Sequence, residues 1–555
     1  MRKSAAAVAV LLVSALIVPS QGIAAQQQDR RRRFVVVYAD GASLASARAA
    51  VKAANATIVS ENAKIGVATV ETRNSNFVQA VENQSALVGA ARNRPIGRAE
   101  PRLRVKPDIE RLDLGAGVEA SSADRRGPEP LAHLQWDMRM IHATKKGSYR
   151  EQRGDPGVMV GIIDTGIEGS HPDIERNFDE EMSRNFTVDI PLVDGPCADD
   201  PDGSCKDPAD VDENGHGTHV AGTVAAPING RGIAGVAPDV TLVNLRGGQD
   251  SGYFFLQPSV DALTYAGDAG VDVVNMSYFI DPWLFNCRGN PADSPAQQRE
   301  QRTIITATQR ALDYAHRRGV TLVSALGNEA IDLGRPKVDT ISPDFPPGEE
   351  KERQISNSCL TLPTEGRHVI GVSALGPSER KSWYSNWGLE QTDVSAPGGD
   401  SVDILPEPRG RILAPYPRVA LEAEGLLDPD GRPNTPAVLR ECRNDRCYYY
   451  RYLQGTSMAS PHAVGVAALI VSEFGESESD KGLTLDPDSV AARLESTATD
   501  HRCPPGRVQE YPELAELEGI VGPWEAYTAH CAGSRERNGF YGHGIVDALS
   551  AVADD

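Results

Sequence analysis

Short apolar runs alternate with amphipathic stretches over most of this chain. Five runs have the length and the β-branched content of buried strands, at 158–163, 241–245, 271–276, 320–325 and 369–373. Three stretches between or after them repeat apolar residues at helical spacing, at 260–267, 306–317 and 460–474. Buried strands that alternate with helices predict an α/β fold built on a doubly wound, mostly parallel sheet.

The first hundred residues have a different pattern. Residues 34–38, 56–59 and 65–70 have strand character, whereas 44–54 and 76–85 have helical spacing. This order predicts a small α+β module ahead of the larger domain. Residues 105–130 then lose periodicity and gain Gly, Pro, Ser, Asp and Arg, which predicts an exposed linker suited to cleavage.

The extreme N-terminus has the pattern of a secretory signal. Arg2 and Lys3 precede an apolar stretch from Ala5 to Val18, and small residues follow it. About 14 apolar residues are short for a membrane span, although a retained signal anchor is the alternative. We therefore expect a signal peptide at 1–25, a module with its linker at 26–115 and the main domain at 116–555. The mature protein should be secreted and extracellular, with no membrane partner after signal cleavage and no other membrane-crossing segment.

Charge is unevenly distributed along the chain. The net charge is −21, which argues against a nucleic-acid partner because phosphate binding needs a positive face. Residues 26–115 carry 15 Lys and Arg against 9 Asp and Glu, a net of +6, while 116–555 carries −29. Opposite charges suggest two parts that attract each other, and two independently solvated surfaces are the alternative.

The chain has eight cysteines, at positions 197, 205, 287, 359, 442, 447, 503 and 531. An even number in an exported chain favours disulfides, and eight cysteines allow 105 pairings. The sequence does not fix the pattern. Pairing of neighbours along the chain is the simplest hypothesis.

Three short motifs place reactive side chains among small residues. Asp164 lies in Val-Gly-Ile-Ile-Asp-Thr-Gly, His216 in Asn-Gly-His-Gly-Thr-His and Ser457 in Gly-Thr-Ser-Met-Ala-Ser-Pro-His. An imidazole can take the proton of a serine hydroxyl, and a carboxylate can hold that imidazole in the required tautomer. The glycines on either side of His216 should leave room for a substrate. Ser457 precedes a predicted helix, whose N-terminal N–H groups can stabilise an oxyanion.

The order of these motifs resembles that of the subtilisin-like serine proteases. Gln135–Met138 and Tyr541–Ala548 resemble the start and the closing motif of the family's catalytic domain. The resemblance implies a serine endopeptidase that works through an acyl-enzyme, with Asp164 orienting, His216 as general base and Ser457 as nucleophile. It implies that Asn328 donates to the oxyanion. The module at 26–115 resembles the family's inhibitory pro-domain, which makes the chain a zymogen with its own pro-domain as a partner.

Protein or peptide substrates are the other implied partner. In the family an extended peptide pairs with two edge segments, here Gly247–Gly252 and Ser277–Phe279. The candidate substrate-binding residues are Gly248, Gly252, Ser277, Tyr278, Ala325 and Gly327. The family usually has Ser-Leu-Gly where this chain has Ser277-Tyr278-Phe279, and smaller residues before the oxyanion Asn, so a broad apolar pocket is not assumed. The aromatic run 253–255 either lines a subsite or packs in the core.

Metal sites and cofactors are weakly indicated. The predicted chemistry requires no cofactor. The acidic loop from Asp199 to Asp212 is dense in the oxygen ligands that calcium prefers, so it could hold a structural calcium ion. A solvated loop closed by a disulfide is the alternative. His219 and His462 lack a metal-binding pattern and are expected to pack structurally.

Two further functions stay open. The chain could be a binding protein or chaperone that has kept the fold without activity, although all four key side chains are present. It could also be a processing protease of narrow specificity, because the substitutions near the primary pocket add bulk there.

Overall fold

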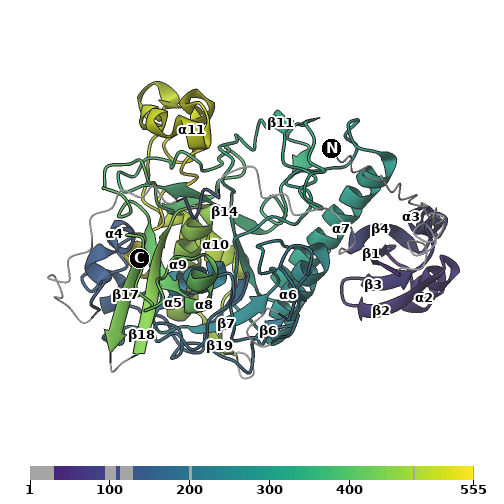
Figure 1. Ribbon diagram of the computed structural model, residues 1–555, viewed down its shortest axis with the longest axis horizontal. Coiled ribbons are helices and arrows are strands. Elements are labelled where there is room, and N and C mark those ends of the chain that lie inside the picture. The colour runs from purple at the N-terminus through teal and green to yellow at the C-terminus, as the bar shows by residue number, and fades with distance from the viewer. Residues whose placement is uncertain are drawn as a thin grey trace, which may run out of the picture.

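The structure is a computed structural model that describes residues 31–93, 108–112, 129–198, 203–443, 446–478 and 482–553. The predicted signal peptide lies outside the described residues. A small N-terminal module and a large body are distinct in Figure 1, where the module is drawn in purple beside the helices of the body.

The N-terminal module is a four-stranded antiparallel sheet covered by two helices, which confirms the predicted α+β class. Its sheet has the order β2-β3-β1-β4. Strand β4 was not predicted, because its alanines and Gly89 lack the β-branched pattern of a strand. The elements are β1 (Arg32–Tyr38), α2 (Leu44–Ala53), β2 (Ala56–Asn62), β3 (Val67–Thr72), α3 (Phe77–Glu82) and β4 (Leu87–Asn93).

The body is built on a seven-stranded sheet in which every pair is parallel, as predicted. Its order is β15-β14-β10-β8-β5-β7-β6. The five predicted strands form its centre, while the short edge strands β6 and β15 were not predicted. The strands are β5 (Met159–Ile163), β6 (Arg184–Asn185), β7 (Thr241–Arg246), β8 (Val273–Met276), β10 (Thr321–Ala325), β14 (Val369–Leu375) and β15 (Val394–Pro397).

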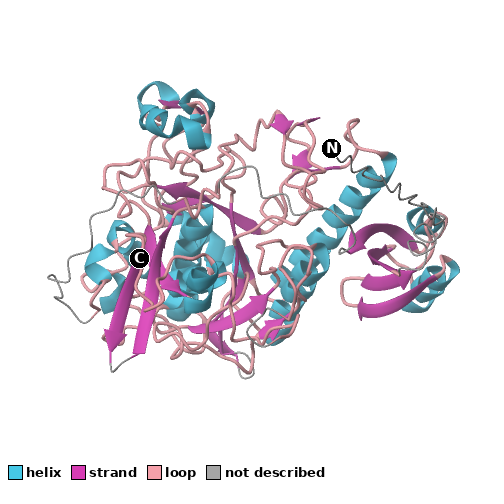
Figure 2. Cartoon of the chain, in the orientation of Figure 1, coloured by secondary structure: helices cyan, strands magenta, loops and turns pink. Residues whose placement is uncertain are grey.

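Helices cover both faces of this sheet (Figure 2). On one face α5 (His216–Ala225) and α9 (Thr456–Phe474) share a hydrophobic core with Val160 and Ile162 of β5. On the other face α6 (Leu256–Ala269) and α7 (Pro295–Arg317) share a second core with Ile163. Successive side chains of a strand point to opposite faces, so one strand contributes to both cores. The doubly wound class is therefore confirmed.

Helix α9 has the length and the hydropathy of a membrane span, contrary to the expectation that no segment after the signal would have them. Among the described helices it is the one that meets this test. However, 83% of its most apolar window is buried inside the body. Its apolar character is that of a central core helix.

The insertion at 400–450 forms a separate antiparallel sheet with the order β16-β18-β17. Its elements are β16 (Ile412–Tyr416), α8 (Arg418–Ala423), β17 (Val438–Arg443) and β18 (Arg446–Leu453). Strand β16 packs against α5, which carries His216. The remaining elements are α4 (Trp136–Met140), β9 (Asn286–Cys287), β11 (Val338–Asp339), β12 (Arg353–Gln354), β13 (Cys359–Leu360), β19 (Glu476–Glu478), β20 (Gly482–Thr484), α10 (Pro487–Ser496), β21 (Val508–Gln509), α11 (Glu518–Val521), β22 (Ala529–His530) and α12 (Ala548–Val552).

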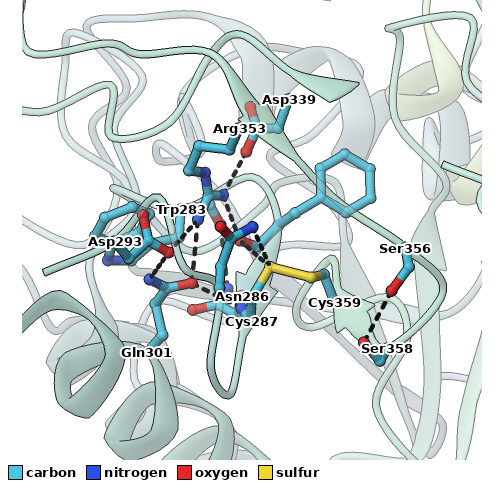
Figure 3. The surroundings of a disulfide bond; sticks show 12 residues. Trp283, Asn286, Cys287, Asp293, Gln301, Asp339, Arg353, Ser356, Ser358 and Cys359 are labelled. Atoms are coloured by element: carbon cyan, nitrogen blue, oxygen red, sulfur yellow. Dashed lines mark hydrogen bonds and ion pairs between the residues drawn. A yellow bond between two sulfur atoms is a disulfide. The ribbon is translucent and has the colours of Figure 1, made fainter. Parts of the chain in front are cut away.

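All eight cysteines are paired as neighbours along the chain, which confirms the simplest hypothesis. The pairs are Cys197–Cys205, Cys287–Cys359, Cys442–Cys447 and Cys503–Cys531. The second pair joins β9 to β13 beside the buried Arg353, which forms ion pairs with Asp293 and Asp339 (Figure 3).

The module docks on α6 and α7 of the body through a shared hydrophobic core, hydrogen bonds and ion pairs. Arg310 donates to the backbone oxygen of Tyr38 at 2.9 Å, and the Asn62 amide donates to Thr264 at 2.9 Å. The ion pairs across this contact are Lys64–Asp268, Asp40–Arg310 and Glu82–Arg299. In two of the three pairs the body supplies the cation, so the local pairs do not follow the net charges of the two parts.

Candidate functional site

The three motifs meet at the carboxyl edge of the large sheet. Asp164 follows β5, His216 begins α5 and Ser457 lies in the first turn of α9. The Nδ1 atom of His216 is 2.7 Å from Oδ1 of Asp164, and that oxygen also accepts a bond from the Thr165 N–H at 2.8 Å. Asp164 is fully buried and His216 nearly so. The Asp164 carboxylate thus holds the imidazole ring at Nδ1. The Nε2 atom, on the opposite side of the ring, faces the part of the site that contains Ser457.

The glycines beside His216 are required by close packing. A Cβ atom on Gly215, whose φ is +92°, would lie 2.4 Å from the ring of Tyr416. A Cβ atom on Gly217 would lie 2.1 Å from the backbone oxygen of Gly166. The expectation that these glycines leave room for a substrate is therefore wrong, because protein atoms fill that space.

Asn328 is fixed beside Ser457 by the start of α9. The Thr456 N–H and hydroxyl both donate to the Asn328 side-chain oxygen at 2.9 Å. The Asn328 Nδ2 atom therefore faces the same space as the Ser457 hydroxyl. Both donate to one oxygen atom, Oε1 of Glu110, at 2.8 and 2.6 Å.

Glu110 was missed by the sequence analysis, and the expectation of an exposed linker is wrong for its segment. The carboxylate lies between the candidate residues, with Oε2 at 3.2 Å from His216 Nε2. Ile109 and Leu112 pack partly buried against the main core. Their apolar side chains beside a charged residue are the one sequence signal that could have marked this segment as bound.

The charges of the site depend on one another. Burial alone would raise the pKa of Glu110, but the His216 charge and three hydrogen bonds lower it to about 2. Burial alone would lower the pKa of His216, but Asp164 and Glu110 hold it well above 6.5. Burial raises the pKa of Asp164, and the His216 charge offsets part of that rise. The two carboxylates thus favour the protonated form of the His216 ring that lies between them.

Two of the candidate substrate-binding residues, Ser277 and Gly327, contact the first turn of α9. Ala325 and Gly252 lie on neighbouring segments. The Ser277 hydroxyl lies 2.8 Å from that of Ser460, and its backbone oxygen is 3.5 Å from Ser457 Oγ. The Gly327 N–H donates to the Thr456 hydroxyl at 3.0 Å. Ala325 ends β10 and is buried, and a Cβ atom on Gly252 would lie 3.8 Å from the Asn214 amide.

The aromatic residues near this edge form part of the core. Tyr278 stacks on Phe254 with ring centroids 4.2 Å apart, and Phe254 also pairs through its backbone with Gly248. Tyr253 and Phe255 pack around Phe345. The aromatic run 253–255 is buried, which agrees with the packing alternative.

Three further buried residues with titratable side chains, Asp173, His219 and His462, lie outside this arrangement. Asp173 accepts hydrogen bonds from the Ile233 N–H and the Tyr450 hydroxyl. His219 and His462 are fully buried among backbone oxygens and Asp137, as a structural role predicts.

The described part of the acidic loop has protein partners. Asp207 pairs with the buried Arg246, which also contacts Asp189 and Asp250. Asp212 accepts bonds from Thr165, Thr218 and the Gly215 N–H, so it supports the turn that carries His216. Residues 199–202 lie outside the described residues.

Comparison with known proteins places the chain in a family. The subtilase family model matches residues 155–544, which include Asp164, His216, Asn328 and Ser457. The chain belongs to the subtilase family. It is therefore a serine-type peptidase by family, a hydrolase of peptide bonds.

Curated relatives agree with this assignment, and a solved structure shares the fold. Subtilisin DY of Bacillus licheniformis is 30% identical over 62% of the chain and 84% of its own length. Fervidolysin of Fervidobacterium pennivorans is 26% identical over 81% of the chain and 53% of its own length. The epidermin leader peptide processing serine protease of Staphylococcus aureus has a similar fold, with a TM-score of 0.59 at 20% identity over 94% of the chain and 98% of that structure.

Proposed function

We propose that this subtilase is a secreted endopeptidase, made as a zymogen, with Asp164, His216 and Ser457 as its triad and Asn328 as an oxyanion donor. One observation carries the proposal. Ser457 Oγ and Asn328 Nδ2 converge on one oxygen atom, while His216 Nε2 contacts the other oxygen of the same carboxylate. A nucleophile, an oxyanion donor and a base around one small group are the parts that acyl transfer needs.

The reaction would proceed in two halves. Ser457 Oγ attacks the peptide carbonyl carbon as His216 Nε2 takes the hydroxyl proton, and the carbonyl oxygen becomes an oxyanion that Asn328 and the N-terminus of α9 stabilise. The C–N bond then breaks, and His216 gives its proton to the leaving amine. Water attacks the resulting ester through the same residues and releases the carboxylic acid and Ser457.

Pairing with the substrate is proposed along the two edge segments. Gly248 and Gly252 lie on one of them and Ser277 and Tyr278 on the other, while Ala325 and Gly327 lead to Asn328. The bulk of Tyr278, stacked on Phe254, favours a restricted primary pocket, and this keeps a narrow processing protease as the second candidate. Leader-peptide processing is what the Staphylococcus aureus neighbour is named for.

Secretion and the zymogen state rest on the N-terminal pattern and on the docked module. The module at 26–115 is proposed as the inhibitory pro-domain, because it packs on α6 and α7 of the body. No cofactor is proposed for the chemistry, and calcium is kept as a candidate structural ion of the acidic loop.

Peptide mapping of a denatured-protein digest tests the function directly. Wild-type protein should release peptides with a shared preference at the cleaved bond, and Ser457→Ala should release none. Many sites with a loose preference would favour a general protease, whereas a few sites with one motif would favour the processing role. A wild-type digest no different from that of Ser457→Ala would support a binding protein that has lost activity.

A further inference from the structure

The segment Asp108–Leu112, here called the strap, crosses the candidate site with a side chain at its centre. The Glu110 carboxylate contacts Ser457, His216 and Asn328 together. A substrate carbonyl needs the same space, because attack requires that carbonyl next to Ser457 Oγ and Asn328 Nδ2. While the carboxylate is there, no peptide bond of the strap is placed for cleavage.

The body binds the strap on both sides of Glu110. The Gln454 N–H donates to the backbone oxygen of Glu110 at 3.3 Å, and the Gln454 amide donates to that of Ile109 at 3.1 Å. On the other side Arg111 donates to the Asn214 side-chain oxygen at 2.5 Å and to its backbone oxygen at 3.1 Å. These contacts belong to the body alone, so the strap is attached independently of the docked module.

The insertion at 400–450 completes the cradle of the strap. Arg111 lies 3.7 Å from Glu424, which follows α8, and Tyr416 of β16 holds Asn214 by a hydrogen bond of 2.9 Å. The carboxylate also lies directly over Gly455, where a Cβ atom would be 2.8 Å from Glu110 Oε1. Shape and charge thus both fit a side-chain carboxylate.

We propose that Glu110 is a built-in carboxylate inhibitor that blocks the catalytic centre of the uncut chain, as a second contact separate from the docking of the module. This rests on the proposed function, because it assigns a regulator to the same centre. The carboxylate takes the place of the acid group that a cleaved product leaves beside the serine. The docked module and the strap are parts of one chain, so binding of either raises the effective concentration of the other at its own site. Each contact can therefore be weak, and the strap can leave the catalytic centre once the chain between the two is cut.

Ionisation controls the strength of this contact. The Glu110 carboxylate faces the His216 ring, and Asp164 lies on the far side of that ring. The neighbouring Arg111 contacts Asp108 and Glu424. The buried Tyr384 also acts on the carboxylate, and burial raises the pKa of Tyr384 well above 10. Glu110 raises the pKa of His216, so binding of the strap takes up a proton. Inhibition is then strongest between the free Glu110 pKa of 4.5 and the free enzyme's His216 pKa. It weakens, at most tenfold per pH unit, as pH rises toward the higher His216 pKa of the bound state, and it also weakens as pH falls below 4.5 and Glu110 takes up a proton.

The test measures how fast a small fluorophosphonate labels Ser457 in the uncut precursor. Precursor is sampled before processing, and label is counted only in the band at full-length mass. Glu110→Gln should be labelled at least about tenfold faster than wild type at pH 7, because a charge-assisted contact is lost. Glu110→Asp should also be faster, since its carboxylate is one methylene short. The control Glu516→Gln removes an exposed carboxylate outside the strap and should behave as wild type.

Equal labelling rates for wild type and Glu110→Gln precursors would overturn the proposal, provided that the mature enzymes hydrolyse casein. Mature wild type that neither labels nor hydrolyses would instead overturn the proposed function. A second measurement follows the His216 ring signals by NMR in Ser457→Ala precursor. The His216 pKa should fall when Glu110→Gln is added, and an unchanged pKa would contradict the contact whatever the stability of the variant.

Discussion

Asn328 is the residue at which one substitution tests the chemistry of the site most simply. Its side-chain oxygen is held by Thr456 and its Nδ2 atom faces the reacting space.

The motifs predicted Asp164, His216 and Ser457 because short runs of small residues surround each of them. Glu110 could not be predicted in the same way, because its role comes from a long-range contact with residues more than 100 positions away in sequence.

Replacing Asn328 with Ala in the mature enzyme should lower kcat by ~10²–10³ while changing KM little, because the donor acts on the oxyanion of the transition state. Steady-state hydrolysis of a chromogenic peptide measures both constants. A rise in KM at unchanged kcat would mean that Asn328 binds the substrate and does not stabilise its transition state.

Lys381 is fully buried, with its Nζ atom donating to the backbone oxygens of Ser382 and Ser385 at 2.8 Å. Burial lowers its pKa from 10.5 to about 7. At a pH between 7 and 10.5, Lys381 is more often protonated in the unfolded chain than in the folded protein. The free energy of unfolding should therefore rise with pH, by at most about 1.4 kcal/mol per pH unit from this one group. Denaturant unfolding of Ser457→Ala protein from pH 7 to 9 should show this slope, and adding Lys381→Met should flatten it. The same slope in both proteins would refute the shift.

At the scale of elements, the long buried strands were predicted and the short ones were not. The pattern of β-branched residues located β5, β7, β8, β10 and β14, whereas β6 has only two residues, Arg184 and Asn185. Helix α5 was not predicted because His216–Ala225 is rich in glycine, which disfavours helices. Its formation depends on packing against α9 and β16, which a local pattern does not encode.

The acidic loop gives a prediction about metal removal. Because Asp207 pairs with Arg246 and Asp212 holds the turn before α5, protein contacts should keep the described part of the loop in place. Dialysis against EDTA should therefore leave the mature enzyme's activity and its thermal midpoint unchanged. A lowered midpoint that recovers with added calcium and not with magnesium would instead show that a calcium ion stabilises the enzyme.

At the scale of the whole molecule, two parts of opposite net charge meet at a contact with three ion pairs. The module supplies the cation in one of them and the body supplies it in the other two. The +6 of residues 26–115 and the −29 of 116–555 favour long-range attraction. The pairs at the contact include two in which the body is the cation, so short-range charge should add little. Net charge was visible in the sequence, but the pairing across α6 and α7 was not.

Salt should therefore slow the encounter of the two parts more than it speeds their separation. The Debye length falls from ~30 Å at 0.01 M to ~8 Å at 0.15 M, which weakens steering. Association of a 26–115 fragment with Ser457→Ala body should be slower at the higher salt, and its dissociation should change less. An association rate independent of salt would remove the electrostatic attraction, and an absence of binding would remove the pro-domain assignment.

The central claim is that Ser457 is the nucleophile of a working triad. Mature wild type is treated with a fluorophosphonate and digested, and the adduct is located by mass spectrometry while casein hydrolysis is followed on the same sample. The account predicts one adduct on the peptide that contains Ser457, loss of hydrolysis in proportion to labelling, and neither label nor hydrolysis in Ser457→Ala. An adduct on another residue, or casein hydrolysis by Ser457→Ala at the wild-type rate, would contradict it.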